Sequence, residues 1–159
     1  MTLLYDNDKL LPYKSRYKRQ LFAVIAVFVL TVVFNVIFFI LLNDENALVF
    51  RIVINAVDIL AFWFIFAFCS LKLLPTSREI RFIDKMVTSE KTVVSGIIKS
   101  YGRNITLSGG SFVEVVISDE KTERIIYFEK NVTYRLCVGD TLNAFIVDGV
   151  ICSFEVQNG

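Results

Sequence analysis

Two long apolar segments lie close together near the start of the chain. Residues 21–42 carry no charged side chain, and residues 52–71 carry only Asp58. A helix of about 20 apolar residues is long enough to cross a hydrocarbon core of about 30 Å. The pattern therefore predicts a membrane-spanning helical hairpin, with transmembrane helices over 21–42 and 52–73 and a short external connector over 43–51.

From Thr92 onward the hydrophobic period changes from helical to about two. The Asp148-Gly149 pair is typical of a type I′ hairpin turn between two strands. Short antiparallel strands must close on one another to protect their edges, so residues 92–159 are expected to form a small all-β domain, an OB- or SH3-like antiparallel barrel bent at Gly96. Six segments rich in β-branched and aromatic residues predict its strands: 92–100, 103–108, 111–118, 124–130, 141–147 and 150–156.

Residues 76–91 link the second apolar segment to this domain. Leu74-Pro75 predicts a break in the helix, and Thr76 with Glu79 fits a capping box that restarts it. Apolar residues then recur at helical spacing with charged residues between them, which predicts an amphipathic linker helix. Two placements are open for this helix: on the membrane surface or against the β domain.

The chain begins with a basic N-terminal flank over residues 1–20, in which Pro12 argues against one continuous helix. Basic residues also follow the second apolar segment, whereas only Arg51 lies in the connector. The positive-inside rule then predicts a multi-pass membrane protein with both termini cytoplasmic. The flank residues expected at the membrane surface are Lys14, Arg16, Lys18 and Arg19.

Charge and residue types exclude several kinds of chemistry. Residues 80–159 hold nine basic and ten acidic side chains, so they lack the basic surface that nucleic acid requires. The chain has no histidine, and Cys69, Cys137 and Cys152 form no CxxC pair, so neither a usual zinc set nor a usual general base is present. We expect no catalytic residue, no metal and no cofactor.

Asp58 is the acidic residue within the apolar segments that needs an explanation. By helix rise it lies about 9 Å into the second segment, and Asn35 lies about 10 Å into the first, so the two reach the same level in an antiparallel hairpin. Arg51, Asn55 and Asp58 are spaced by four and three residues and share one helix face. The favoured interpretation is a polar contact of Asp58 with Asn35 that fixes helix register or subunit contact. A proton or cation site, or contact with a partner helix, are the alternatives, and a neutral acid is an alternative state.

The order of membrane hairpin, short linker and small barrel resembles the NfeD-type membrane proteins. In this resemblance, Gly96-Ile97-Ile98 lies at the start of the barrel, and Val138-Gly139-Asp140 precedes the last hairpin of the barrel. The resemblance implies an OB-like barrel and a role in assisting membrane partners. It carries no functional residue over to this chain.

Together these patterns and the resemblance favour a non-enzymatic integral protein of the cell (inner) membrane, of bacterial type. We expect it to act as a membrane-anchored interaction or scaffold module through its cytoplasmic β-barrel. Its expected partners are the lipid bilayer together with another protein, further copies of the same chain, or both. The alternative is a small oligomeric channel or transporter subunit with Asp58 on a polar path. A membrane-tethered enzyme ranks last because the usual general base is missing.

Overall fold

The computed structural model divides the chain into two compact units. One comprises residues 1–13 and 78–159, called here the β unit, and the other comprises residues 14–77, called the helical unit. Helices α1 and α3 each contribute residues to both. The residues that the structure describes are 1–41, 47–107, 110–119, 122–131 and 136–157.

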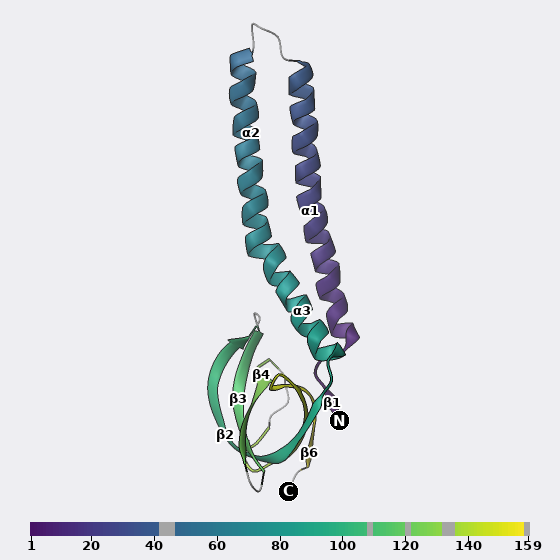
Figure 1. Cartoon of the computed structure of the whole chain (residues 1–159), viewed down its shortest axis with the longest axis vertical. Coiled ribbons are helices and arrows are strands. Elements are labelled where there is room, and N and C mark those ends of the chain that lie inside the picture. The colour runs from purple at the N-terminus through teal and green to yellow at the C-terminus, as the bar shows by residue number, and fades with distance from the viewer. Residues whose placement is uncertain (42–46, 108–109, 120–121, 132–135, 158–159) are drawn as a thin grey trace. The chain divides into compact units, whose positions relative to one another are not determined.

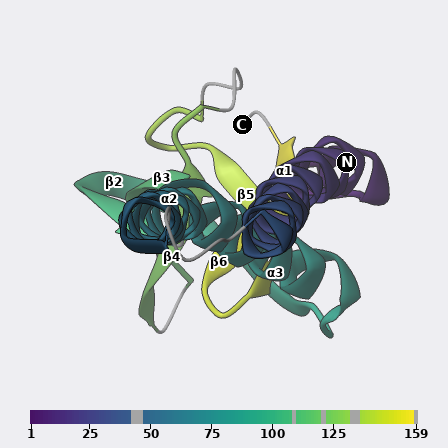
Figure 2. The same ribbon diagram turned by 90° about the horizontal axis from the view of Figure 1, so that it is seen from above.

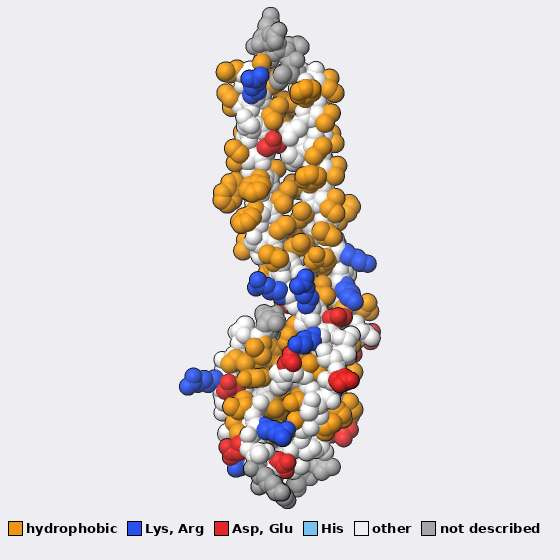
Figure 3. Space-filling model, in the orientation of Figure 1, with side chains coloured by type: hydrophobic (Ala, Val, Ile, Leu, Met, Phe, Trp, Pro, Cys, Tyr) orange, Lys and Arg blue, Asp and Glu red, His pale blue; other side chains and the backbone are white. Residues whose placement is uncertain are grey.

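The helical unit is built from α1 (Asn7–Ile40) and α2 (Ala47–Phe68), which run side by side in opposite directions (Figures 1 and 2). Both helices are long and apolar enough to cross a membrane. No residue of α2 is buried, and hydrophobic side chains cover most of the visible face of these helices (Figure 3). Apolar side chains left uncovered by protein need lipid or another chain around them. The predicted hairpin of two apolar helices is confirmed, while residues 42–46 of its connector lie outside the described residues.

Helix α1 starts well before the first apolar segment. The Asp6 carboxylate accepts a hydrogen bond from the Lys9 backbone N–H at 2.8 Å, which caps the helix at its start. Pro12 lies inside α1, so the expectation that it would prevent one continuous helix was wrong. Proline removes one backbone hydrogen bond, and burial of Leu10 in the β unit stabilises this first part of the helix in compensation.

The predicted helix break at Leu74-Pro75 was also wrong. Helix α2 continues through a π-helical turn, η1 (Cys69–Leu73), into α3 (Leu74–Thr88). The Leu74 N–H bonds to the Cys69 carbonyl, a spacing of five residues that accommodates the proline without a break. The Thr76 hydroxyl donates back to the Lys72 carbonyl at 2.8 Å, so Thr76 is a mid-helix residue and forms no capping box.

The β unit contains six strands among the described residues, and five of them form a closed ring in the order β2-β3-β4-β6-β5, because β5 pairs with both β2 and β6. Neighbouring strands are antiparallel except at one parallel bridge, between Tyr127 and Val150. The short β1 pairs with β6. The predicted small all-β domain is thus confirmed as a ring of mostly antiparallel strands. The strands are β1 (Thr2–Leu3), β2 (Thr92–Leu107), β3 (Gly110–Ser118), β4 (Glu123–Glu129), β5 (Thr141–Val147) and β6 (Val150–Gln157).

Strand β2 replaces two predicted strands. Tyr101-Gly102, which separates the predicted strands 92–100 and 103–108, lies inside β2 at an irregularity in its pairing with β3. A bulge bends a strand and strengthens its twist without reversing the chain, so the curved β2 pairs with β5 at one end and with β3 at the other. The Asp148-Gly149 turn is confirmed, since both residues have positive φ.

Gly96 lies close to the point where β2 passes from β5 to β3. A Cβ atom at this position would lie 2.7 Å from the Ser118 carbonyl oxygen. No side chain fits there without a backbone shift, so the glycine allows β2 and β3 to approach each other at the predicted bend.

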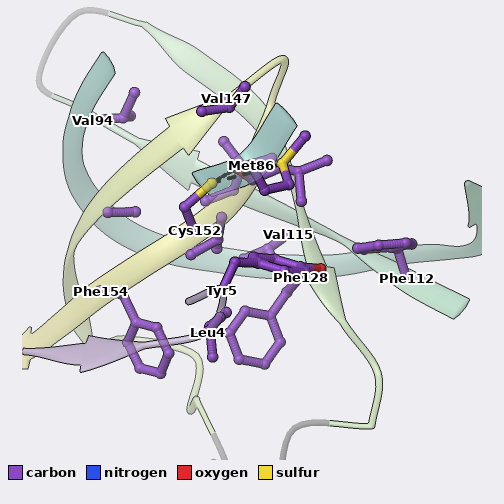
Figure 4. Packing of buried hydrophobic residues seen from close by; sticks show 14 of the residues in the cluster. Leu4, Tyr5, Met86, Val94, Phe112, Val115, Phe128, Val147, Cys152 and Phe154 are labelled. Atoms are coloured by element: carbon purple, nitrogen blue, oxygen red, sulfur yellow. Dashed lines mark hydrogen bonds between the residues drawn. The ribbon is translucent and has the colours of Figure 1, made fainter. Parts of the chain in front are cut away.

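The core of the β unit includes residues far outside the strands. Leu4, Tyr5 and Leu10 from the N-terminal segment and Ile83 and Met86 from α3 are buried together with the strand residues. Figure 4 shows Leu4, Tyr5 and Met86 among them. The amphipathic face of α3 therefore packs against the β domain, which decides between the two placements open for this helix. The compact unit also begins earlier than residue 92, because strand residues alone do not complete its core.

Candidate functional site

The first candidate site is the polar contact between the two apolar helices. The Asn35 amide donates a hydrogen bond from Nδ2 to Asp58 Oδ1 at 2.8 Å. Phe38 and Phe50 meet edge to face nearby, with ring centroids 5.3 Å apart. The predicted contact of Asn35 with Asp58 is present in the structure, and it joins α1 to α2.

Arg51 and Asn55, which were predicted on the same helix face as Asp58, do not join this contact. Arg51 and Asn55 are exposed, and within the described part of the chain no hydrogen bond or ion pair connects either of them to Asp58. The amide oxygen of Asn35, Oδ1, is also buried at the contact, and it has no hydrogen-bond partner among the described residues. The structure therefore brings together Asn35 and Asp58 and leaves one acceptor beside them unused.

The basic residues predicted at the membrane surface all lie on α1 within the helical unit. Lys14, Arg16, Lys18 and Arg19 are exposed. No ion pair involves any of them within the described ranges. Their charges are available to solvent or to anionic headgroups.

A second polar cluster, which the sequence did not reveal, joins the N-terminal segment to β4. Lys9 Nζ forms an ion pair with Glu129 Oε2 at 2.9 Å, and it lies 4.6 Å from the centre of the Tyr5 ring. Tyr5 is only 3% exposed. The basic character of residues 1–20 favoured a membrane-surface role for this segment and hid its packing role. The available signal was Leu4-Tyr5 followed by Leu10, an apolar set too short to identify by periodicity.

Tyr5 carries a buried hydroxyl with no hydrogen-bond partner in the described structure. Burial, and then the nearby Glu129 carboxylate, raise the pKa of Tyr5 well above its ordinary value near 10. In the unfolded chain Tyr5 ionises near pH 10, whereas in the folded chain it stays protonated to higher pH. Its contribution to stability is therefore present below pH 10 and decreases as the pH rises above it.

Tyr5→Phe should remove this alkaline loss. We expect the free energy of unfolding of the unchanged protein to fall by up to about 1.4 kcal/mol per pH unit above pH 10 from Tyr5 alone, and the variant to lack this component. In protein that lacks Cys69 and the exposed Cys137, the fully buried Cys152 reports unfolding of the β unit when its thiol becomes reactive in urea. Tyr17→Phe, in the helical unit, should keep the alkaline loss, and an unchanged slope in Tyr5→Phe would contradict the role of Tyr5.

The outer face of the β ring carries a third candidate site. Val93, Ile97 and Ile125 are each at least 50% exposed, and the partly exposed Val116 lies opposite Ile125 in the pairing of β3 with β4. We call these four residues the outer-face cluster. The exposed ion pair between Lys99 and Glu123, at 2.8 Å, lies on the same strands. Apolar side chains grouped beside charged ones are typical of protein-binding surfaces.

The described residues contain no group of three His, Cys, Asp or Glu side chains that could hold a metal ion. Burial raises the pKa of the Cys152 thiol, and its sulfur lies 3.7 Å from the Met86 sulfur inside the core. A buried thiol of this kind is a packing residue and a poor nucleophile.

Comparison with known proteins finds no family model that matches this chain, no similar curated protein and no similar solved structure.

Proposed function

We propose that this protein is a non-enzymatic, membrane-anchored interaction module. The helical hairpin holds it in the bilayer, and the β unit presents the outer-face cluster to a protein partner. The observation that carries the proposal is the exposure of Val93, Ile97 and Ile125 on the outside of a folded domain. Exposed apolar groups of this kind lower the solubility of a free domain and are covered when a partner binds.

The β unit is assembled from both ends of the chain, which supports a topology with both termini on one side of the membrane. Residues 1–13 precede the first apolar helix and residues 78–159 follow the second, yet they form one compact unit. Two segments that share one core lie on the same side of a bilayer. The positive-inside rule then favours the cytoplasmic side.

The order of the strands supports an OB-like barrel. A long first strand that pairs at both ends, a closing pair between β2 and β5, and a parallel bridge between β4 and β6 together make a five-stranded Greek-key ring. The order of hairpin, linker and barrel resembles that of the NfeD-type proteins. By that resemblance, the proposed role is that of a small barrel that assists membrane partners.

A photo-crosslinking experiment tests the interaction role. A benzophenone amino acid placed at Ile97 or Ile125 of the full-length protein in native membranes should give a discrete adduct with another protein. The same probe at Val138, which is 61% exposed but outside the cluster, should not. Ile97→Asp combined with Ile125→Asp should abolish the adduct formed from a probe at Val93, while Val138→Asp should retain it. Equal crosslinking from all positions, or an adduct that survives the double substitution, would contradict the proposal.

The unused Asn35 acceptor favours a second function to be tested, that of a small channel or transport subunit. A buried acceptor is satisfied by a donor from another copy of the chain, and an oligomer of hairpins would place Asp58 along a polar path. If the contact only sets packing, Asp58→Asn should keep the oligomer size in detergent and leave ion flux in proteoliposomes unchanged, because an amide oxygen still accepts the bond from Asn35. Loss of flux with retained assembly would establish the transport role instead.

A further inference from the structure

A cavity of about 430 Å³ lies in the β unit beside α3. One side of it is basic, formed by Arg78, Arg81 and Lys85 of α3. Another side is apolar and includes Phe82 and Val150. A ligand that fills this cavity must match both kinds of surface.

The basic side retains a net positive charge. Arg78, Arg81 and Lys85 are spaced by three and four residues, so they project from one face of α3. Lys85 is bridged to Asp148, which neutralises it. Arg78 and Arg81 form no ion pair within the described residues. Two guanidinium groups are therefore free to bind an anion, and their forked geometry suits the oxygens of a phosphate.

The apolar side is held in place by the core. Val150 is 3% exposed, and the Phe82 ring packs edge to face against Phe112 at a centroid distance of 5.7 Å. A rigid apolar wall beside two arginines suits an amphiphile better than a simple ion, because the wall contributes only if the ligand covers it.

The position of Arg78 in the chain supplies a source for such a ligand. Arg78 lies four residues after Leu74, which is near the end of the second apolar segment. Four residues reach at most about 14 Å, even when fully extended. If the hairpin spans a bilayer as proposed above, Arg78 is therefore held close to the headgroup layer, where anionic phospholipids attract basic side chains.

We propose that this cavity binds the headgroup of one anionic membrane phospholipid. Arg78 and Arg81 donate hydrogen bonds to its phosphate oxygens, while Phe82 and Val150 contact the glycerol and the first carbons of an acyl chain. The site is distinct from the outer-face cluster, and it gives the β unit a direct attachment to lipid.

Lipid retention by the full-length protein tests this site. The protein is reconstituted in nanodiscs that contain phosphatidylcholine and phosphatidylglycerol. It is then released from the nanodiscs, and the lipids that stay bound to it are identified by native mass spectrometry. The unchanged protein should retain phosphatidylglycerol in preference to phosphatidylcholine. Arg78→Gln combined with Arg81→Gln should reduce that preference by about 30-fold, since each basic side chain near a membrane contributes roughly a fivefold effect. Arg103→Gln combined with Arg124→Gln, which removes two exposed arginines from β2 and β4, should leave it unchanged.

The outcomes separate this site from its alternatives. An equal loss in both double variants would show diffuse surface charge and overturn the proposal. Displacement of the lipid by millimolar glycerol 3-phosphate would show that a free phosphate ester, and no acyl chain, is recognised, which would also overturn it. Failure of the protein to enter nanodiscs at all would contradict the membrane hairpin, so that result is distinguishable from loss of the lipid site alone.

Discussion

Leu10→Ala should destabilise the β unit by about 2–5 kcal/mol, although residue 10 lies 82 positions before the first long strand at Thr92. Leu10 is 3% exposed and belongs to the core of that unit. Its truncation removes buried apolar surface and leaves a cavity between the N-terminal segment and the ring of strands. The effect is measured on the full-length protein in detergent, from the urea concentration at which Cys152 becomes reactive in a variant that lacks Cys69 and Cys137.

Leu11→Ala is the matched control for this substitution. Leu11 is the next residue on the same helix, and it is 61% exposed. The two variants lose the same atoms and have the same effect on helix propensity, so they differ only in burial. Leu11→Ala should change the free energy of unfolding by less than about 0.5 kcal/mol. Equal effects of the two substitutions would show that the N-terminal segment does not pack in the β unit.

Phe112→Ala should have a comparable or larger effect, a loss of about 3–5 kcal/mol. Phe112 is 1% exposed and lies on β3. Its ring meets Phe82 of α3 edge to face, so the substitution removes both core volume and the aromatic contact that joins α3 to the sheet. The Cys152 reactivity assay in urea measures this loss as well.

Val113→Ala provides the comparison for Phe112. Val113 is the next residue of β3, and it is partly exposed because successive residues of a strand point to opposite faces. We expect a loss of no more than about 1.5 kcal/mol from Val113→Ala. Because α3 is held by Phe112, Phe112→Ala should also increase hydrogen exchange in residues 78–88, and Val113→Ala should not. Unchanged exchange in α3 after Phe112→Ala would contradict the packing of this helix on the sheet.

The features that local pattern determines could be predicted from the sequence. The apolar segments were long enough to identify two helices, and counting depth from both ends placed Asn35 opposite Asp58, where a hydrogen bond joins them. The Asp148-Gly149 pair identified its hairpin because few residue pairs adopt positive φ in succession. Strand boundaries at β5 and β6 followed from the same turn chemistry.

Features that depend on contacts between distant segments could not be predicted. Tyr101-Gly102 has the composition of a turn, but pairing of the flanking residues with β3 keeps it within one bent strand. Leu4 and Tyr5 belong to a short apolar stretch beside Asp6, and nothing in their local pattern shows that β1 pairs with β6. The cavity beside α3 escaped notice for the same reason, since Arg78, Arg81 and Val150 meet only after the chain has folded.

The central claim is that the hairpin crosses a membrane and that both chain ends belong to one domain on the cytoplasmic side. Labelling with a membrane-impermeant maleimide tests it most directly. Cys137 is exposed in the β unit and Cys152 is fully buried, so a Cys69→Ala protein carries one natural reporter. A second protein that carries Glu45→Cys, with Cys137 also replaced by alanine, reports on the connector.

In sealed right-side-out vesicles the connector cysteine should react and Cys137 should not, and in inverted vesicles the pattern should reverse. A zero-length carbodiimide crosslink between Lys9 and Glu129, whose charged groups lie 2.9 Å apart, should form in the same vesicles. Labelling of Cys137 and position 45 from the same side would contradict the account.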